Sequence, residues 1–178
     1  MKSVLLFITV ILFSTQTFGQ EAVAITNDQF SLNLVAPSIE WEVSTGQKST
    51  IDLKLGTGIG YAKSGSESEF GFFPHFASQY RYYYNFDKRI KKGKKVSENS
   101  GNYLAAIANI RSGNSIIGDL DLREDYAILI GPAWGLQRTY NSGFKLNLNL
   151  GAGYGFNDIG DSYFSPFIGI QLGWLVAK

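Results

Sequence analysis

Few side chains in this sequence are suited to catalysis or metal binding. The chain of 178 residues contains one histidine, His75, and no cysteine. A serine–histidine–acid hydrolytic site needs all three groups within hydrogen-bond reach. Ser78 lies three residues from His75, which puts it on the opposite face of a strand. Because a zinc site needs several nitrogen or sulfur ligands, one histidine does not predict one. We expect no catalytic residue, no bound metal and no cofactor.

Charged residues lie at alternating positions within apolar, strand-like segments. They are Glu40, Glu42, Asp52, Lys54, Arg81 and Lys145. Since alternate side chains of a strand point to opposite faces, all of them are expected on the polar face of the sheet. Three acids meet three bases, and an unpaired buried charge is costly. The pattern predicts a salt-bridge network that plugs a narrow interior; a charged gate or small pore is the alternative.

A second group of residues predicts a different surface within the same interior. Its members are glycines from two strands and two side chains from a third strand: Gly56, Gly58, Gly151, Gly153, Phe73 and His75. Glycine eases sheet bending, so aromatic rings packed over glycines are the simpler interpretation. The alternative is a small cavity, open to the outside, that accepts a hydrophobic or lipid-like group.

A basic run lies in the polar connection at residues 87–100. It consists of Lys88, Arg89, Lys91, Lys92, Lys94 and Lys95. Such a run could contact anionic cell-wall polymer or lipid phosphate, although a solvated loop is the simpler interpretation. The sequence has no phosphate-binding loop, DNA-reading motif or heptad repeat. No nucleic-acid partner is expected.

Strands with a two-residue period must position these groups. The clearest is 144–156, whose even positions carry Phe, Leu, Ala and Tyr while its odd positions carry Lys, Asn and Gly. It is longer than the usual strand of about 5–6 residues. It matches the about 9–11 residues that a tilted strand needs to cross a bilayer. Similar alternation predicts further strands at residues 50–61, 70–86, 103–112, 126–140 and 163–176.

The strand count depends on the first part of the chain. Bacterial barrels have an even number of strands and both termini in the periplasm, which requires a strand before 39–44. The favoured candidate is 30–35, with an outer turn at 36–38. The alternative is one bent strand over 30–44, with the eighth strand hidden within 115–122.

Turn positions also predict which inward residues share a level of the sheet. The short turns at 45–48 and 141–143 face the periplasm, as does the basic connection, and the loops at 62–69, 113–125 and 157–162 face outward. Counting from these turns places Glu42, Thr50 and Arg81 at one level, with Glu40, Asp52 and Gln79 at the next.

The N-terminal segment has the features of a secretory signal peptide. Lys2 precedes an apolar run at 4–13, shorter than the about 20 residues of a membrane helix, and a polar stretch ends at Gly19. We predict a signal peptide over 1–19, cleavage near Gly19 or Gln20, and one domain over 20–178. Loss of Lys2 from the 16 basic residues leaves them equal to the 15 acidic residues. A neutral mature chain has no overall attraction to nucleic acid.

The composition of the polar face favours a membrane barrel over a soluble one. Both classes have one apolar face, but a solvated outer face would be rich in Lys, Glu, Asp and Thr. Here that face is mainly Gly, Ala and Asn with isolated charges, which suits a narrow enclosed interior. Aromatic residues gather near strand ends, as in interfacial girdles. The sequence predicts an all-β, eight-stranded antiparallel up-and-down transmembrane β-barrel.

The chain resembles the small eight-stranded outer-membrane barrels of Gram-negative bacteria, with OmpA/OmpX/OmpW-like architecture. It is especially similar to barrel domains of unknown function in Bacteroidota. The resemblance covers the mature chain and rests on the signal peptide, the Tyr-Arg-Tyr-Tyr-Tyr-Asn-Phe stretch at 80–86, the strand at 144–156 and the closing strand ending near Trp174. That family's terminal signal ends in an aromatic residue, whereas this chain ends Leu-Val-Ala-Lys.

The resemblance implies location in the bacterial cell outer membrane, as a monomer inserted by the barrel-assembly machinery. Outer-membrane lipid and lipopolysaccharide are the implied partners. The expected function is a non-enzymatic structural or surface-interaction role with a plugged polar lumen. A porin-like channel or carrier for a small or hydrophobic ligand is the first alternative. An outer-leaflet lipid hydrolase is the second.

Overall fold

The alternating segments of the sequence form the strands of one antiparallel sheet. The computed structural model describes residues 26–178, so the predicted signal peptide lies outside the described residues. The strands are β1 (Gln29–Asn33), β2 (Ser38–Gly46), β3 (Ser49–Ser64), β4 (Glu67–Tyr82), β5 (Asn102–Ser112), β6 (Ile117–Gly118), β7 (Tyr126–Thr139), β8 (Phe144–Asn157) and β9 (Ser162–Ala177). A short helix, α2 (Phe86–Lys91), follows β4. No helix within residues 26–178 has the length and apolar character needed to cross a membrane.

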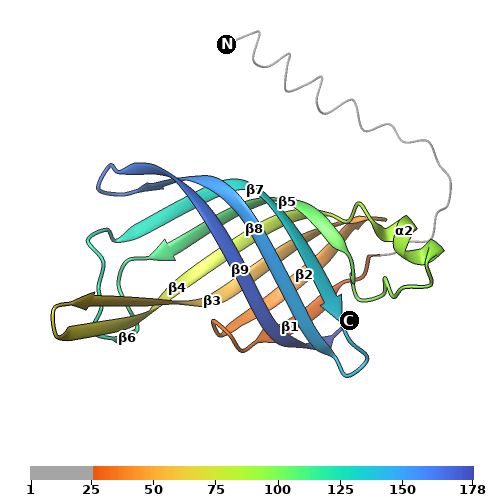
Figure 1. Cartoon of the computed structure of the whole chain (residues 1–178), viewed down its shortest axis with the longest axis horizontal. Helices are drawn as coiled ribbons and strands as arrows, with labels where there is room; N and C mark the ends of the chain where they lie inside the picture. Colours follow the sequence, from red (N-terminus) through yellow and green to blue (C-terminus); the bar gives the residue numbers. More distant parts are fainter. Residues whose placement is uncertain (1–25) are drawn as a thin grey trace, which may run out of the picture.

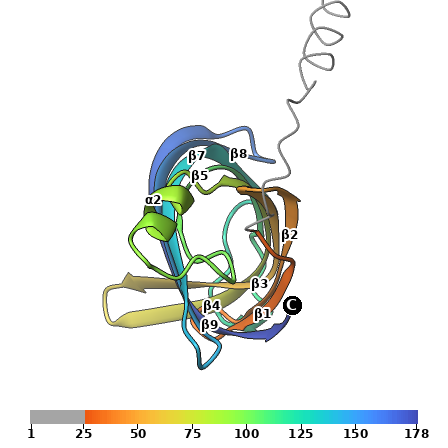
Figure 2. The ribbon, with the colours of Figure 1, turned by 90° about the vertical axis from the view of Figure 1, so that its right-hand side faces the viewer.

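Eight of the strands close into a hydrogen-bonded ring. Around the ring the order is β1, β2, β3, β4, β5, β7, β8 and β9, and β9 pairs with β1. Figures 1 and 2 show the ring from the side and along its length. The prediction of two separate strands before Ser49 is confirmed. Region 115–122 contributes only β6, which extends the β4 edge beyond β5.

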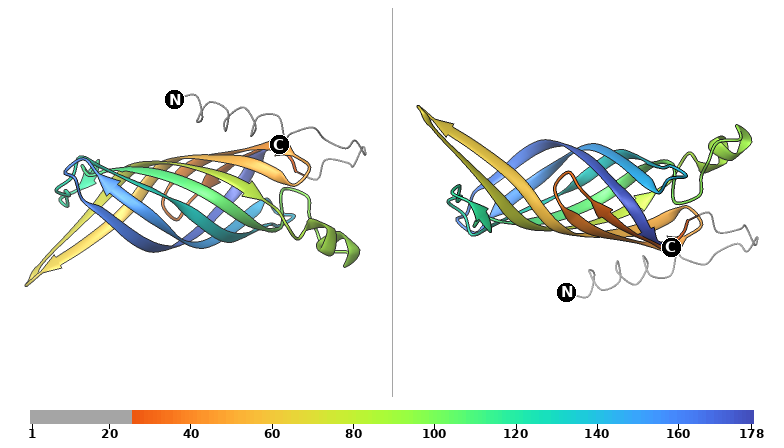
Figure 3. Two further views of the ribbon diagram at one scale, coloured as in Figure 1. Left: turned by 90° about the horizontal axis from the view of Figure 1, so that it is seen from above. Right: turned by 90° about the horizontal axis from the view of Figure 1, so that it is seen from below.

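The two ends of the ring differ. At the α2 end lie the β2–β3, β4–β5 and β7–β8 connections together with Lys178 (Figure 1). At the opposite end, here called the hairpin end, the β3–β4 hairpin projects beyond the ring (Figure 3). The connections therefore alternate between the ends as an up-and-down strand order requires.

Polar side chains fill the ring and apolar side chains cover its outside. Arg81 has an exposed fraction of 0%, whereas Ile168 and Phe164 are 78% and 75% exposed. Soluble proteins show the reverse, since Arg is almost never fully buried unless paired. Outward aromatic residues gather toward both ends: Tyr82, Tyr84, Tyr140 and Trp174 toward α2, and Tyr61, Phe70, Tyr126, Tyr154 and Phe164 toward the hairpin end.

Two details of the predicted strands are wrong. β4 ends at Tyr82, four residues before the predicted end, because the chain turns into α2. Phe86 is consequently buried, and its ring stacks on that of Tyr83 with centroids 4.7 Å apart. Second, Glu42 pairs with Asp52 rather than Thr50. The observed register differs from the predicted one by two residues, which leaves every side chain on its expected face.

The wall of the ring is interrupted toward the hairpin end. β2 pairs with β3 only as far as Gly56, and β1 pairs with β9 only as far as Gly173. The Thr57 amide donates to the Pro37 carbonyl and the Leu34 amide donates to the Leu172 carbonyl, which closes the corner around the β1–β2 turn. Beyond these contacts, β3 residues 58–64 and β9 residues 162–171 have no mutual pairing among the described strands. We call this interruption the seam.

Candidate functional site

The structure brings the six predicted inward charges together in one buried group, here called the charge cluster. Arg81 is at its centre. Its Nη2 lies 2.9 Å from Asp52 Oδ1, and its Nη1 lies 3.6 Å from Glu42 Oε2 and 3.7 Å from Glu40 Oε1. Each of the three acids therefore lies within ion-pair distance of one guanidinium group.

Lysines from two strands complete the charge cluster. Lys145 Nζ lies 2.6 Å from Glu40 Oε1 and 3.8 Å from Glu42 Oε2. Lys145 is on β8 and Glu40 is on β2, with β9 and β1 between them in the ring. Lys54 Nζ is less closely paired, at 3.9 Å from Asp52 Oδ1 and 4.0 Å from Glu40 Oε2. All six side chains are buried, so the pairing neutralises charges that water does not reach.

Uncharged side chains hold the charged groups; Thr50 and Gln79 were expected at these levels, whereas Tyr83 and Gln137 were not. Glu42 accepts hydrogen bonds from Tyr83 Oη at 2.6 Å, Thr50 Oγ1 at 2.7 Å and Gln137 Nε2 at 2.9 Å. Arg81 in turn donates to Gln79 and Gln137 at 3.0 and 3.1 Å. Each of these residues is at an inward-facing position of its strand. This two-residue alternation is the sequence feature that could have identified them.

One of these hydrogen bonds spans the whole ring. Gln137 lies on β7 and Glu42 on β2, and these strands are four positions apart in a ring of eight. The guanidinium of Arg81 also lies over the ring of Tyr103, 4.9 Å from its centroid. Side chains from opposite walls therefore meet at the level of the charge cluster.

Carboxylate oxygens of Glu40, Glu42 and Asp52 lie within 4.8 Å of one another, a spacing that could hold a metal ion. In this structure the positive charge at the triad comes from Arg81, Lys145 and Lys54, whose nitrogen atoms lie within ion-pair distance of these carboxylates. The donor set is already balanced by protein charges and does not require a cation.

The chain following α2 closes the α2 end of the ring. Asn99 exchanges two hydrogen bonds of 2.9 Å with the backbone of Asn27, and both Asn99 and Ser100 are buried. Glu98 and Asn99 have φ angles of 50° and 52°, in the left-handed region. The connection is therefore folded tightly over the end of the ring.

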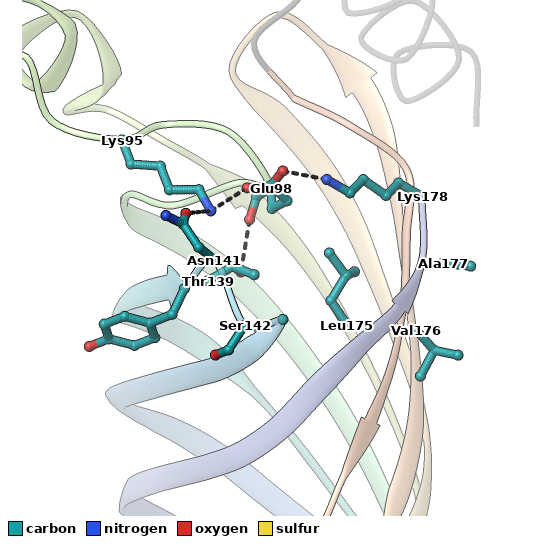
Figure 4. A pocket seen from close by; sticks show the side chains of 11 residues that line it. Lys95, Glu98, Thr139, Asn141, Ser142, Leu175, Val176, Ala177 and Lys178 are labelled. Carbon is teal, nitrogen blue, oxygen red and sulfur yellow. Dashed lines mark hydrogen bonds and ion pairs between the residues drawn. The ribbon is translucent and has the colours of Figure 1, made fainter.

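Glu98 anchors this connection to the C-terminal strand (Figure 4). Its carboxylate lies 2.7 Å from Lys95 Nζ and 2.6 Å from Lys178 Nζ, beside a depression of about 480 Å³. Partial burial acts to raise the pKa of Glu98, but hydrogen bonds from Lys178, Lys95 and Ser97 outweigh it and lower the pKa to about 2.

The rest of the basic run lies on and after α2. Arg89 donates to the Lys95 carbonyl, whereas Lys88, Lys91, Lys92 and Lys94 are exposed. Lys88, Lys92 and Lys94 line an open depression of about 320 Å³ with Arg138. The run therefore forms a solvated basic surface at the α2 end.

Residues predicted to line an outer cavity are mostly covered by side chains. Phe73 is buried and its ring lies against Gly60 and Gly71. Phe167 covers Gly151, Leu129 covers Gly153, and the β1–β2 turn lies against Gly56. Around Gly58 there is space, since the nearest neighbour to an added Cβ is 3.9 Å away. Arg111 lies over the Phe73 ring and pairs with Glu124 at 2.8 Å, which closes the hairpin end.

A cavity of about 180 Å³, here called the inner cavity, lies between these aromatic side chains and the charge cluster. His75 lines it together with Lys54, Gln79, Asn109, Phe167 and Gln171. Ser78 points to the outer face, opposite Leu53 of β3, and so the structure does not bring it to His75. Of the predicted cavity residues, His75 is the one that lines this space.

Comparisons with protein-family models, with curated proteins and with solved structures gave no match. Function is therefore argued from the geometry of this chain.

Proposed function

We propose that the ring spans the outer membrane of a Gram-negative bacterium as a small transmembrane β-barrel. In this proposal the chain is a non-enzymatic structural or surface-interaction protein, and its lumen does not conduct. The observation that carries the proposal is the inverted distribution of polarity, with paired charges inside and large apolar side chains outside.

The outward apolar surface supports the membrane position. Exposing apolar surface to water costs roughly 25 cal/mol per Å², and monomeric soluble proteins rarely expose continuous apolar patches of more than a few hundred Å². Residues such as Leu55, Ile130 and Leu150 are exposed on separate strands. In hydrocarbon the same surface carries no such cost, and the belts of Tyr and Trp suit the two interfaces.

The packed interior supports the absence of conduction. The hydrogen bond between Gln137 and Glu42 crosses the ring, and the connections at both ends fold over its openings. Ions entering from either end would have to displace buried, mutually paired charges. The hairpin end instead offers surface for contact, since the β3–β4 hairpin carries exposed Lys63, Glu67 and Glu69 near its tip.

Planar-bilayer recording tests the proposal. We expect the refolded wild-type chain to show no steady single-channel steps, because the charge cluster seals the lumen. An Arg81→Ala variant removes the central cation, and Arg123→Ala, at an exposed residue, serves as the control. Steady wild-type conductance that changes in Arg81→Ala but not in Arg123→Ala would establish the channel alternative instead.

Lipid hydrolysis is tested separately. His75 and Ser78 lie on opposite faces of β4, so a nucleophile–base pair from these two residues is not formed. We expect the lipid A mass to stay unchanged in cells that overproduce the protein. A lipid A species lacking an acyl chain, produced by wild type but not by His75→Ala, would overturn the non-enzymatic assignment.

A further inference from the structure

The inner cavity reaches the seam at β9, and residues of β4, β5, β7 and β8 line most of the rest of it. Lys54 of β3 lines it on one side, and Phe167 and Gln171 of β9 line it on the other. Figure 3 shows the β3–β4 hairpin leaning away from the ring on this side. The cavity therefore adjoins a part of the wall where neighbouring strands are not hydrogen-bonded to each other.

A strand proline supports the presence of the seam. The Leu172 carbonyl accepts from Leu34 of β1, and alternate residues of a strand direct their peptide groups to the same side. Pro166 therefore presents its nitrogen toward the seam. Proline cannot donate a ladder hydrogen bond and within sheets is found at edges, strand starts and bulges, so this residue fits the free edge of β9.

Lys54 is the charged group that faces the inner cavity. Its side chain is 2% exposed, and its Nζ has no hydrogen-bond partner within residues 26–178. The carboxylates of Asp52 and Glu40 lie 3.9 and 4.0 Å from Nζ and balance its charge without accepting a hydrogen bond. An ammonium group has three donors, and leaving them unbonded in a buried site is costly. Asn109 Oδ1 and Gln171 Oε1, in the same lining, also lack partners. The two amide oxygens are acceptors, so Lys54 Nζ is the donor that an anionic ligand in this cavity can use.

We infer that the inner cavity binds the carboxylate of an alkyl carboxylic acid, with the carboxylate on Lys54 Nζ and the chain extending through the seam. A carboxylate supplies the charge-assisted acceptors that an ammonium group prefers. The volume of about 180 Å³ is below the roughly 300–1,000 Å³ of most ligand pockets, so it fits a head group and a few methylenes. Phe167, Ile107 and Leu129 supply apolar contacts.

The path through the seam rests on the proposed membrane position, whereas the contact with Lys54 does not. The test uses the refolded chain in nonionic detergent micelles and dodecanoate labelled with ¹³C at its carboxyl carbon. We expect a bound carboxyl resonance, distinct from the micellar one, that unlabelled dodecanoate displaces. Dodecanol should not displace it, because an alcohol has no charge for Lys54.

Matched variants locate the binding. Ala77→Leu fills the inner cavity while keeping all charges, and should weaken binding at least tenfold. Ala106→Leu makes the same change at an exposed position outside the cavity lining and should leave binding within twofold. Lys54→Met should abolish the bound resonance. If Lys54→Met fails to fold, the Ala77→Leu and Ala106→Leu pair decides.

Several results would overturn the inference. Absence of a bound resonance with the wild-type chain would mean that the cavity does not bind the carboxylate. Equal affinity in wild type and Ala77→Leu would place dodecanoate in the micelle or on the surface. Hexanoate bound as tightly as dodecanoate would refute the path through the seam. If the chain is folded and monomeric without detergent, the membrane proposal fails, yet a hexanoate titration in that buffer still tests the contact with Lys54.

Discussion

Arg81 is the side chain that lies within ion-pair distance of all three carboxylates of the charge cluster. Its guanidinium lies 2.9–3.7 Å from carboxylates on two other strands, and its side chain is fully buried. The pairing itself adds little net stability, since burying each charge carries a desolvation cost. Removing one partner is different, because the remaining charges then have no compensation.

Arg81→Ala should therefore lower the free energy of unfolding by about 3–5 kcal/mol, the usual cost of breaking a buried ion pair. Urea titration of the chain in lipid vesicles, followed by tryptophan fluorescence, measures this change. Arg123→Ala removes an exposed guanidinium and should stay within about 0.5 kcal/mol of wild type. Equal effects of the two substitutions would show that the cluster does not depend on Arg81.

Glu98 gives the connection over the α2 end a defined pH dependence. Its pKa is about 2 in the folded chain, against an ordinary 4.5, because hydrogen bonds from Lys178, Lys95 and Ser97 outweigh the effect of burial. Folding depresses this pKa, so the stability from Glu98 is present above about pH 4.5 and is lost as pH falls toward 2.

The unfolding midpoint of wild type should exceed that of Glu98→Gln at pH 7, and the difference should vanish as pH approaches 2. Thermal scans over this range check the prediction. Glu67→Gln, at an exposed position on the hairpin, corrects for general effects of acid. A gap between wild type and Glu98→Gln that persists unchanged at pH 2 would mean that the carboxylate charge is not what anchors the connection.

At the level of elements, alternation in the sequence predicted the ring strands and the face of each inward charge. It succeeded because the side-chain period of a strand is two, which alone assigns faces. Register was less predictable: a two-residue shift between β2 and β3 changes the partner of Glu42 without moving any side chain to the other face. The turn between β2 and β3 also carries an irregularity between Ser44 and Gly46, which residue spacing alone does not reveal.

The inner cavity could not be located from one sequence, because its position depends on rings that come from other strands. Phe167 covers Gly151 and Leu129 covers Gly153, and neither contact follows from the spacing of residues along one strand. Likewise, α2 and β6 are too short to show a hydrophobic period. The sequence therefore predicted the order of the strands and the face on which each side chain lies. It did not predict the packing between distant strands or the short elements.

Some inward-facing glycines are covered by a side chain and others are not, and substitution by alanine distinguishes the two kinds. A Cβ at Gly135 would lie 2.3 Å from the buried ring of Tyr103, whereas a Cβ at Gly58 would meet nothing closer than 3.9 Å. Gly135→Ala should cost about 1–3 kcal/mol by overpacking. Gly58→Ala should be neutral or stabilise by up to about 1 kcal/mol. Urea titration compares them, and equal costs would contradict the observed covering of Gly135.

Hydrogen exchange tests the seam within a single strand. Thr57 donates toward β2, so by alternation the amides of Ile59 and Tyr61 face the seam. An amide without a ladder hydrogen bond is not protected from exchange, so these amides should exchange at least a hundredfold faster than that of Leu53, which faces β2. Gly58 and Gly60, whose amides face β4, are the internal controls. Protection of Ile59 and Tyr61 equal to that of Leu53 would show that the seam is closed.

The membrane proposal for the whole molecule depends on which face of the ring meets water. Its outer face would be unusual on a soluble protein, and its buried charges are stable only because they are paired with one another. Ile168 is the sharpest probe of this assignment. It is 78% exposed and lies along β9 between the outward residues Phe164 and Trp174, in the middle of the proposed membrane belt.

Ile168→Arg should reduce the unfolding free energy in lipid vesicles by about 2–4 kcal/mol, the cost of arginine near the bilayer midplane of a barrel. Ile159→Arg makes the same change at an exposed residue in the β8–β9 loop, beyond the belt, and should stay within about 0.5 kcal/mol of wild type. A soluble ring would tolerate both, since each arginine would be hydrated. Urea titration in vesicles measures the two values, and a harmless Ile168→Arg would place this face in water and overturn the membrane proposal.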